Sequence, residues 1–305
     1  MECFMKANKV SRYNMRILWK NVRIPFILII VVLYVMESLS AVLTFSQSVH
    51  IDATPFAFVF LINNYRIQFV IAACAVILFC NAPFEDESYQ YMIFRAGKLS
   101  WGLGQIFYIL KTSILYTACL AAASMIPFLG HITWSNEWGK IWGTLGKTNA
   151  GAEFGVELSV SQNIIRQYEP AYALVISILL EFSCILCIGL IIYFGNKMTA
   201  KSVGTFIGAL IAVLDICVSN DWLDWAYGFS PVSLTQLELF NGFAPKWGIN
   251  LAYAEKFFMI AIVSLSVLCV AANYKEKVIS RISRRHIYGR YSKRIIPLRF
   301  ASKSN

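Results

Sequence analysis

Long apolar blocks, each about the length of a helix that crosses a membrane, dominate this chain. The first block, Ile24–Phe45, reads IPFILIIVVLYVMESLSAVLTF, and a helix needs roughly 20 apolar residues to cross about 30 Å of hydrocarbon. We interpret five further blocks as spans too: Ile67–Ala82, Leu103–Leu129, Ala171–Phe194, Val203–Val218 and Phe257–Asn273. The predicted fold class is all-α, a polytopic membrane protein with six transmembrane helices.

Lys and Arg residues are concentrated in the connections on one side of these six spans. Six precede the first span and ten follow the sixth, and the connections after the second and fourth spans add Arg95, Lys98, Lys197 and Lys201. Cytoplasmic loops carry an excess of Lys and Arg. We therefore expect both termini to be cytoplasmic, in a chain that crosses the cell membrane several times.

The formal net charge of +10 indicates which kind of charged partner the chain meets. A nucleic-acid-binding protein carries its basic residues on a soluble domain or along one exposed stripe. Here the basic residues flank apolar blocks, which is typical of a protein that contacts anionic lipid. Membrane lipid is an expected partner, and nucleic acid is not.

Residues 1–23 form a basic lead whose charges recur at helical spacing. The cations fall on one face of a helix: Lys6, Lys9, Arg12, Arg16, Lys20 and Arg23. Phe4, Met15, Leu18 and Val22 fall roughly opposite. The pattern predicts a cytoplasmic amphipathic helix in the headgroup layer, with its apolar side toward the lipid. Such a helix anchors the topology, and docking of a partner on it is a compatible second role.

The rest of the chain divides into a six-span transmembrane domain, residues 24–273, and a basic cytoplasmic tail, residues 274–305. Two long connections face the outside in this threading. One is an insert at residues 131–170, and the other is a segment at 219–250 that mixes Trp and Tyr with turn residues. Because Trp and Tyr are enriched at membrane interfaces, we expect the second to be an ordered external segment.

A polar stretch, EDESYQYMIFRAGKLSWGLGQ (residues 85–105), lies at the cytoplasmic end of the second and third spans. It combines acids where a helix N-terminus favours them, an apolar side at helical spacing, and cations near its end. These residues are Glu85, Asp86, Glu87, Tyr89, Met92, Ile93, Arg95 and Lys98. We predict a short amphipathic helix, ended by Gly97, of the kind that docks in a groove on another protein.

This layout resembles that of ABC-2 type permease subunits, the membrane halves of ATP-driven bacterial exporters. Shared features are a cytoplasmic N-terminal helix, six spans and a charged helix between the second and third spans. The stretches FRAGKLSWGLGQI (94–106) and FSPVSL (229–234) look like the corresponding loop and external segment of many members. The 131–170 insert departs from the pattern, because many members have a short connection there.

The resemblance implies a role for the charged helix and a set of partners. Residues Glu85–Lys98 would be the coupling helix that receives motion from a separate cytoplasmic ABC ATPase. That ATPase would bind ATP and Mg, and two permease chains, identical or paralogous, would form the pathway. The direction implied is export from a bacterial cell. The segment at 219–250 would dip back into the membrane before the sixth span.

Motifs for chemistry within this chain are not evident. A phosphate-binding loop needs G-x-x-x-x-G-K-[ST]; Gly146, Lys147 and Thr148 match its end, but the first position is Ile141. The three His residues are far apart and show no metal-ligand spacing. We expect a transport subunit that is not an enzyme, with no catalytic, cofactor-binding or metal-binding residues.

Four charged residues interrupt the apolar blocks: Glu37, Lys111, Glu181 and Asp215. A charge at the centre of a membrane helix costs about 2.5–3.5 kcal/mol on insertion scales. One hypothesis is that Glu37 or Glu181 pairs with Lys111, or lines a substrate path between subunits. The alternative is a protonated Glu that is hydrogen-bonded within the bundle, while Asp215 reaches water at the outer end of its span.

Two other classes of protein fit the same span pattern. A non-transporting membrane protein, such as an immunity factor or a sensor component, would need the topology but no ATPase. A secondary transporter would be expected to show internal inverted repeats, and we find none by inspection. Transport driven by a separate ATPase is the function that the resemblance favours.

Overall fold

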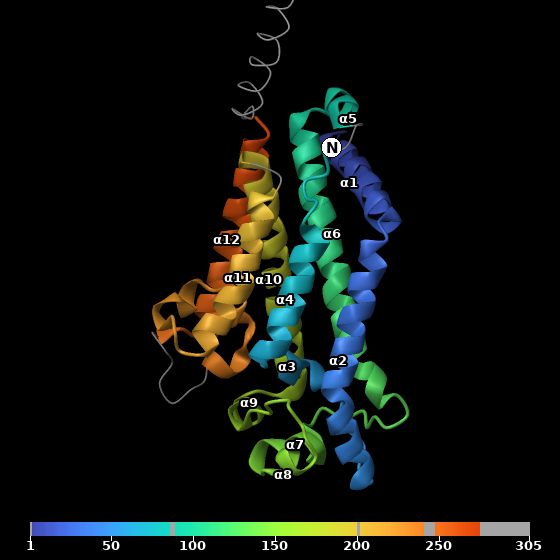
Figure 1. The fold of residues 1–305 in the computed structure, drawn as a ribbon, viewed down its shortest axis with the longest axis vertical. Helices are drawn as coiled ribbons and strands as arrows, with labels where there is room; N and C mark the ends of the chain where they lie inside the picture. The colour runs from blue at the N-terminus through green and yellow to red at the C-terminus, as the bar shows by residue number, and fades with distance from the viewer. Residues whose placement is uncertain (1, 86–88, 200–201, 241–247, 275–305) are drawn as a thin grey trace, which may run out of the picture.

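The computed structural model describes residues 2–85, 89–199, 202–240 and 248–274. These residues form a bundle of long helices with shorter helices at both ends, and their only extended pairing is an isolated bridge between Ala53 and Ile132. The predicted all-α fold class is confirmed for this part of the chain. We name the two ends of the bundle by their short helices, the α5 end (α5, Tyr89–Ala96) and the α7 end (α7, Gly139–Lys147) (Figure 1).

Four helices in the described part are long and apolar enough to cross a membrane. They are α2 (Arg23–Ser48), α6 (Lys98–Met125, continued by the turn η1, Ile126–Phe128), α10 (Pro170–Met198) and α12 (Leu251–Ala272). Each coincides with one of the predicted spans. The described chain therefore has the helices of a membrane protein.

The two remaining predicted spans correspond to shorter helices, α4 (Tyr65–Phe79) and α11 (Val203–Ser219). At 1.5 Å per residue these helices are about 22 and 26 Å long, which is less than the roughly 30 Å of a typical hydrocarbon core. Asn64 caps α4, because its side chain accepts a hydrogen bond from the Arg66 N–H at 3.0 Å. Crossing by all six helices stays a prediction.

The central helix of the bundle is α10. It contacts α4, α6, α11 and α12, and 61% of its most apolar 18-residue window is buried, against 17–44% in the other three long helices. A helix that is apolar on all sides is expected inside a bundle. The helices around it keep exposed apolar side chains, such as Phe206 of α11 and Val263 of α12, which suit contact with lipid.

The contact between α10 and α11 is close enough to require glycine. A Cβ added to Gly204 would lie 2.2 Å from the carbonyl oxygen of Ile192, and one added to Gly195 would lie 2.6 Å from the Cα of Gly204. Small residues permit this approach between membrane helices. Asn196 reinforces the contact, because its Oδ1 accepts a hydrogen bond from the Gly204 N–H at 2.9 Å.

The basic lead forms α1 (Glu2–Lys20), which packs along the first half of α6 (Figure 1). Its buried residues are Ala7, Val10, Ser11, Asn14 and Leu18. Gly104 of α6 permits the contact, since an added Cβ would lie 2.6 Å from the Val10 side chain. The predicted helix is present. Of the residues predicted to face lipid, Leu18 is buried in protein, whereas Phe4 and Val22 are exposed.

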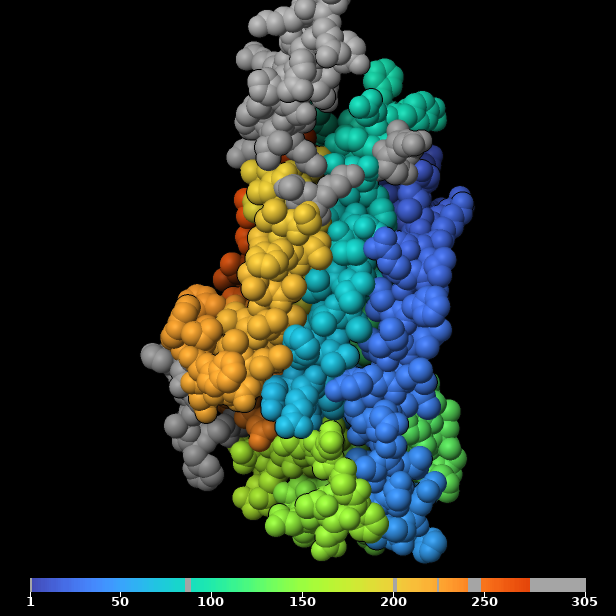
Figure 2. Space-filling model, in the orientation of Figure 1, coloured from blue at the N-terminus to red at the C-terminus, as the bar shows by residue number. Residues whose placement is uncertain are grey.

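The 131–170 insert forms a helical cap at the α7 end, made of α7, α8 (Ala150–Glu153) and α9 (Gln162–Gln167). The rings of Trp138 and Trp142 lie 5.3 and 5.0 Å from that of Phe60 in α3 (Ala57–Ile62). Trp142 also donates its Nε1–H to the carbonyl oxygen of Thr54 at 3.1 Å. Figure 2 shows this cap beside the far end of α2.

The segment after α11 folds back against the bundle through three turns, η2 (Asp224–Phe229), η3 (Ser233–Thr235) and η4 (Leu237–Phe240). The η3 turn contacts both α10 and α11, and its three residues are fully buried. The segment is thus more than an external loop, because it contributes polar side chains to the interior of the bundle.

The glycine contact can be tested by adding a single methyl group. Gly204→Ala should lower the free energy of unfolding by about 1–3 kcal/mol, the usual cost of overpacking a well-packed contact. Thermal unfolding of the purified protein in detergent measures the effect. Gly143→Ala is the control, because a Cβ at Gly143 in α7 meets nothing within 4 Å. Equal melting temperatures for the two variants would contradict the close contact.

Candidate functional site

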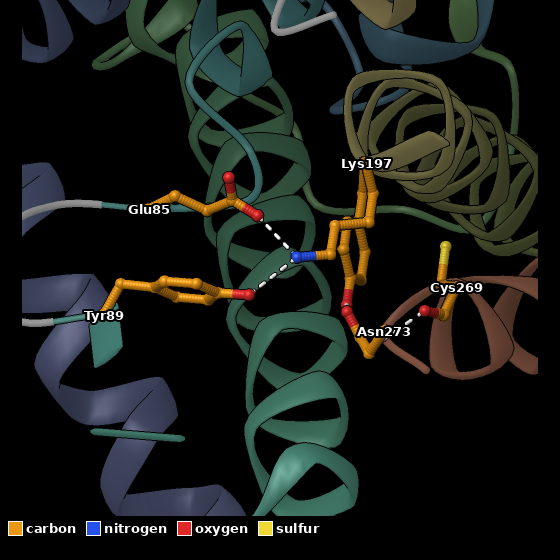
Figure 3. A network of polar contacts seen from close by, with 6 residues as sticks. Glu85, Tyr89, Lys197, Cys269 and Asn273 are labelled. Atoms are coloured by element: carbon orange, nitrogen blue, oxygen red, sulfur yellow. Dashed lines mark hydrogen bonds and ion pairs between the residues drawn. The ribbon is translucent and has the colours of Figure 1, made fainter. Parts of the chain in front are cut away.

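A buried lysine lies at the centre of the α5 end. Lys197, in the last turn of α10, places its Nζ 2.6 Å from Oε1 of Glu85 and 2.8 Å from the hydroxyl oxygen of Tyr89 (Figure 3). The Lys197 and Glu85 side chains are 6% and 12% exposed. A cation in the last turn of a helix also meets the negative end of the helix dipole. The site therefore joins α10 to the segment that begins α5.

Two aromatic rings surround the same ammonium group. Lys197 Nζ lies 5.0 Å from the ring centre of Tyr89 and 5.0 Å from that of Trp101 in α6. The two rings meet edge-to-face with centres 4.9 Å apart. Because a desolvated cation is attracted to aromatic faces, the rings offset part of the cost of burying Lys197. One side chain thus links α5, α6 and α10.

Asn273, directly after α12, attaches the fourth long helix to the same end. Its Nδ2 donates to the hydroxyl of Tyr193 at 3.0 Å. It also donates to the carbonyl oxygen of Cys269 at 3.1 Å (Figure 3). Gly102 of α6 makes room for it, since an added Cβ would lie 2.2 Å from Asn273 Nδ2. Tyr193 lies one turn before Lys197 on α10, so the ends of α6, α10 and α12 meet beside the lysine.

The residue before the lysine holds the chain that leads into α5. Asn196 donates its Nδ2–H to the carbonyl oxygen of Ala82 at 2.7 Å, beyond the end of α4. Asn196 and Lys197 therefore bind the start and the end of the stretch from residue 82 to residue 89. The base of α5 is fixed to α10 at both points.

The α5 helix itself projects from the bundle. It contains no buried residue, and Phe94 is 90% exposed. Tyr91 is 62% exposed and accepts a hydrogen bond from Arg95 Nη1 at 3.0 Å. An exposed aromatic side chain on a helix that packs so little marks a surface for a partner.

The turn between α5 and α6 depends on Gly97. This residue has a φ of 84°, in the left-handed region that glycine adopts without strain. A Cβ there would meet nothing within 4 Å, so the requirement is for backbone conformation rather than for space. The predicted helix break at Gly97 is present.

The predicted coupling residues have different surroundings. Glu85 and Tyr89 bind Lys197, Met92 and Ile93 are half-buried, and Arg95 is exposed. Lys98 is the first residue of α6, with its Nζ 6.0 Å from the ring centre of Tyr274. Asp86 and Glu87 lie outside the described residues.

A groove of 570 Å³ lies between α1 and α5. Among the described residues, its lining includes the cations Lys6, Lys9 and Arg95 together with Tyr91 and apolar side chains, and no acid. Lys6 also pairs with Glu2 of its own helix at 2.7 Å, and this exposed pairing lowers the pKa of the Glu2 carboxyl. The groove suits a partner surface that is apolar with acidic groups at its edge.

Within the described chain Lys111 pairs with neither Glu37 nor Glu181, and a substrate path between subunits stays a prediction. Lys111 Nζ donates to Oδ1 of Asn8 at 2.7 Å, because α1 lies against α6 at this level. Glu181 instead accepts a hydrogen bond from Gln68 Nε2 at 2.6 Å, and Glu37 is exposed on the outer face of α2.

Glu181 and Asp215, the two buried acids within the bundle, belong to polar contacts that include side chains of the folded-back segment. Gln68 of α4 bridges Glu181 and the Thr235 hydroxyl, at 2.6 and 2.9 Å. Asp215 accepts hydrogen bonds on Oδ1 from the Ser233 hydroxyl at 2.8 Å and from Gln236 Nε2 at 3.3 Å. Asp215 is fully buried, so the expectation that it reaches water is wrong.

Replacing Lys197 should leave the Glu85 carboxylate without its cation. Lys197→Met should lower the free energy of unfolding by about 2–4 kcal/mol, because removing one member of a mostly buried ion pair leaves the other charge buried without a partner. Thermal unfolding in detergent measures this loss.

Two further variants make that measurement specific. Lys98→Met removes an exposed cation at the same end and should leave the melting temperature nearly unchanged. Adding Glu85→Gln to Lys197→Met should recover part of the loss, since residues in contact are energetically coupled. A double variant no more stable than Lys197→Met would show that the ion pair contributes little.

Comparison with known proteins does not identify the chain. No family model matches it, and no curated protein or solved structure is significantly similar to it. The resemblance to ABC-2 permeases therefore stays an expectation from the sequence.

Proposed function

We propose that this chain is the membrane-spanning permease subunit of an ATP-binding-cassette exporter, which moves substrate with ATP hydrolysed by a separate ATPase. One observation carries the proposal: α5 is an exposed helix whose base is fixed by a buried ion pair to the central helix α10. A docking helix must present a surface to its partner and transmit the partner's movement. The exposure of α5 and its attachment to α10 support both parts of this role.

The docking surface is formed by α5 and the neighbouring groove. Phe94 supplies a large exposed apolar side chain, and the groove beside α1 supplies the cations Lys6, Lys9 and Arg95. Exposed aromatic and Arg side chains are the residue types enriched in protein interfaces. A cytoplasmic ATPase with an apolar cleft and acidic edges is the partner that fits.

The transmission path runs through Lys197. A displacement of α5 acts on Glu85 and Tyr89, and both hold the Lys197 ammonium. Since α10 contacts α4, α6, α11 and α12, a movement of its end reaches most of the bundle. Closure of the ATPase pair would thereby change the packing of the spans.

The proposed orientation places the α5 end in the cytosol of a bacterial cell. The basic residues of α1 support this, as does Lys197 at the same end, because cationic residues favour the cytoplasmic side. The helical cap of residues 131–170 then faces the outside. The proposal places the ATP and Mg sites on the ATPase.

A second permease chain is proposed at the outer face of α2. Exposed residues there include Phe26, Ile30 and Leu33, and Glu37 continues the same stripe one turn further. Charged residues in membrane helices almost always face protein or water rather than lipid. A second copy of this chain, or a similar one, covers the stripe and shields Glu37.

Docking through α5 can be tested at Phe94. With candidate ABC ATPases co-expressed, Phe94→Asp should abolish the co-purification of an ATPase in mild detergent, because a buried charge would replace an apolar contact. Trp134→Asp is the matched control, since Trp134 is 76% exposed and lies at the α7 end; it should retain the ATPase. If the unmodified chain retains no ATPase, the proposed transport mechanism is rejected and a non-transporting membrane protein is favoured.

Orientation can be tested with a membrane-impermeant maleimide on whole cells. Phe94→Cys should be labelled only after the cells are permeabilised, whereas Trp134→Cys should be labelled in intact cells. The unmodified chain, whose eight cysteines are free thiols, gives the background. Labelling of position 94 in intact cells would show that the α5 end faces the outside, where a cytoplasmic ATPase could not bind it.

Contact between two copies can be tested on α2. Ser40→Cys, exposed one turn from Glu37 on the same face, should give a disulfide-linked dimer when membranes are mildly oxidised. Leu210→Cys is the control, because it is similarly exposed on α11 but lies away from the proposed contact. Dimer formation by the control alone would place the partner elsewhere.

A further inference from the structure

A pocket of 420 Å³ opens at the α7 end, and its lining comes from elements far apart in the chain. Asn63 and Asn64 contribute from the junction of α3 and α4, Glu157 from the cap, and Tyr227 and Glu238 from the folded-back segment. Asn63 fixes part of the wall, since its Oδ1 accepts a hydrogen bond from the Glu238 N–H at 2.9 Å. The pocket is thus built where the three parts meet.

The charges around this pocket are mainly negative. In the described part of the chain, its lining carries three acids, Glu157, Asp221 and Glu238, against one cation, Arg66. Arg66 donates its Nε–H to the Tyr65 hydroxyl at 3.3 Å and also attracts Glu157, so it offsets part of this negative charge. This local excess of acids runs against the net charge of the whole chain, which is +10.

Buried polar atoms beneath the pocket also lack partners. Gln236 lines the pocket and donates to Asp215, so it stands between the pocket and that buried carboxyl. Among the described residues, the second oxygen of Asp215, Oδ2, has no hydrogen-bond partner, and neither has the hydroxyl of Tyr227, which lines the pocket and is 1% exposed.

Asp215 also lacks a cation within the described chain. Its hydrogen-bond partners there are the neutral side chains of Ser233 and Gln236. Burial, together with the nearby Asp215 carboxyl, raises the pKa of the Tyr227 hydroxyl. A buried carboxyl with an unsatisfied oxygen is costly unless a donor or a positive charge compensates it. The acids at the mouth and the orphaned acceptor below both favour a cationic ligand.

We propose that this pocket binds a small organic cation that carries a primary ammonium or guanidinium group. Glu157 and Glu238 pair with the charge, because a charged donor and a carboxylate make the stronger class of hydrogen bond. The Tyr227 hydroxyl and the Gln236 amide bind the polar remainder. Resting on the transport function proposed above, the inference names organic cations as the substrate class.

The test measures binding directly on the purified full chain in an uncharged maltoside detergent. Titration calorimetry with 1,5-diaminopentane and with agmatine, which carries a guanidinium at one end, should show saturable binding. 1,5-Pentanediol, of the same length but neutral, should show none. The cation that binds with the lower dissociation constant indicates whether ammonium or guanidinium is preferred.

Variants link the binding to the pocket. Combining Glu157→Gln with Glu238→Gln should weaken diamine binding at least tenfold, as expected when two charged contacts are lost. Glu153→Gln removes an exposed acid of α8 outside the pocket lining and should leave the dissociation constant unchanged. Asp215→Asn should also weaken binding; because this buried site is sensitive to folding, its melting temperature is measured alongside.

The outcomes separate this inference from the proposed function. Binding by the diol as strong as by the diamine, or unchanged binding by the double variant, would overturn the cation site. Cation binding without any retained ATPase would support the site and count against transport. A retained ATPase without cation binding would reject the site alone.

Discussion

The α5 end depends on the burial of one ammonium group. Lys197 is 6% exposed in a chain that is 58% hydrophobic, and a charge in such surroundings is stable only where acceptors and aromatic faces replace its water. Glu85, Tyr89 and Trp101 supply these at distances of 2.6, 2.8 and 5.0 Å. Because they come from separate elements, the ammonium group determines how those elements are joined.

The positions of the long helices could be predicted because apolar length is a local property. The apolar blocks beginning at Ile24 and Ala171 coincide with α2 and α10 to within a few residues. Gly97 separates α5 from α6, at the position where a helix was expected to end. The start of α6 was placed late, at Leu103 instead of Lys98, since a helix continues into polar surroundings that a hydropathy pattern excludes.

Side-chain partners could not be predicted, because they depend on which helices become neighbours. Lys111 finds Asn8, 103 residues away, only because α1 folds along α6. Glu181 and Asp215 find Gln68 and Ser233 because the segment after α11 returns to the bundle. In the sequence, Lys197 was used only to predict topology. Its position beside Asn196, in the last turn of a long helix, was the signal that could have indicated a polar contact at this end of the bundle.

The left-handed backbone at Gly97 has a mechanical consequence. A continuous helix would carry a push on α5 straight along the axis of α6. Here the two helices meet at a conformation with φ of 84°, while residues 85 and 89 are attached to α10. If α5 receives motion as proposed, a force at Phe94 would turn α5 about Gly97 and would act on Lys197 through Glu85 and Tyr89.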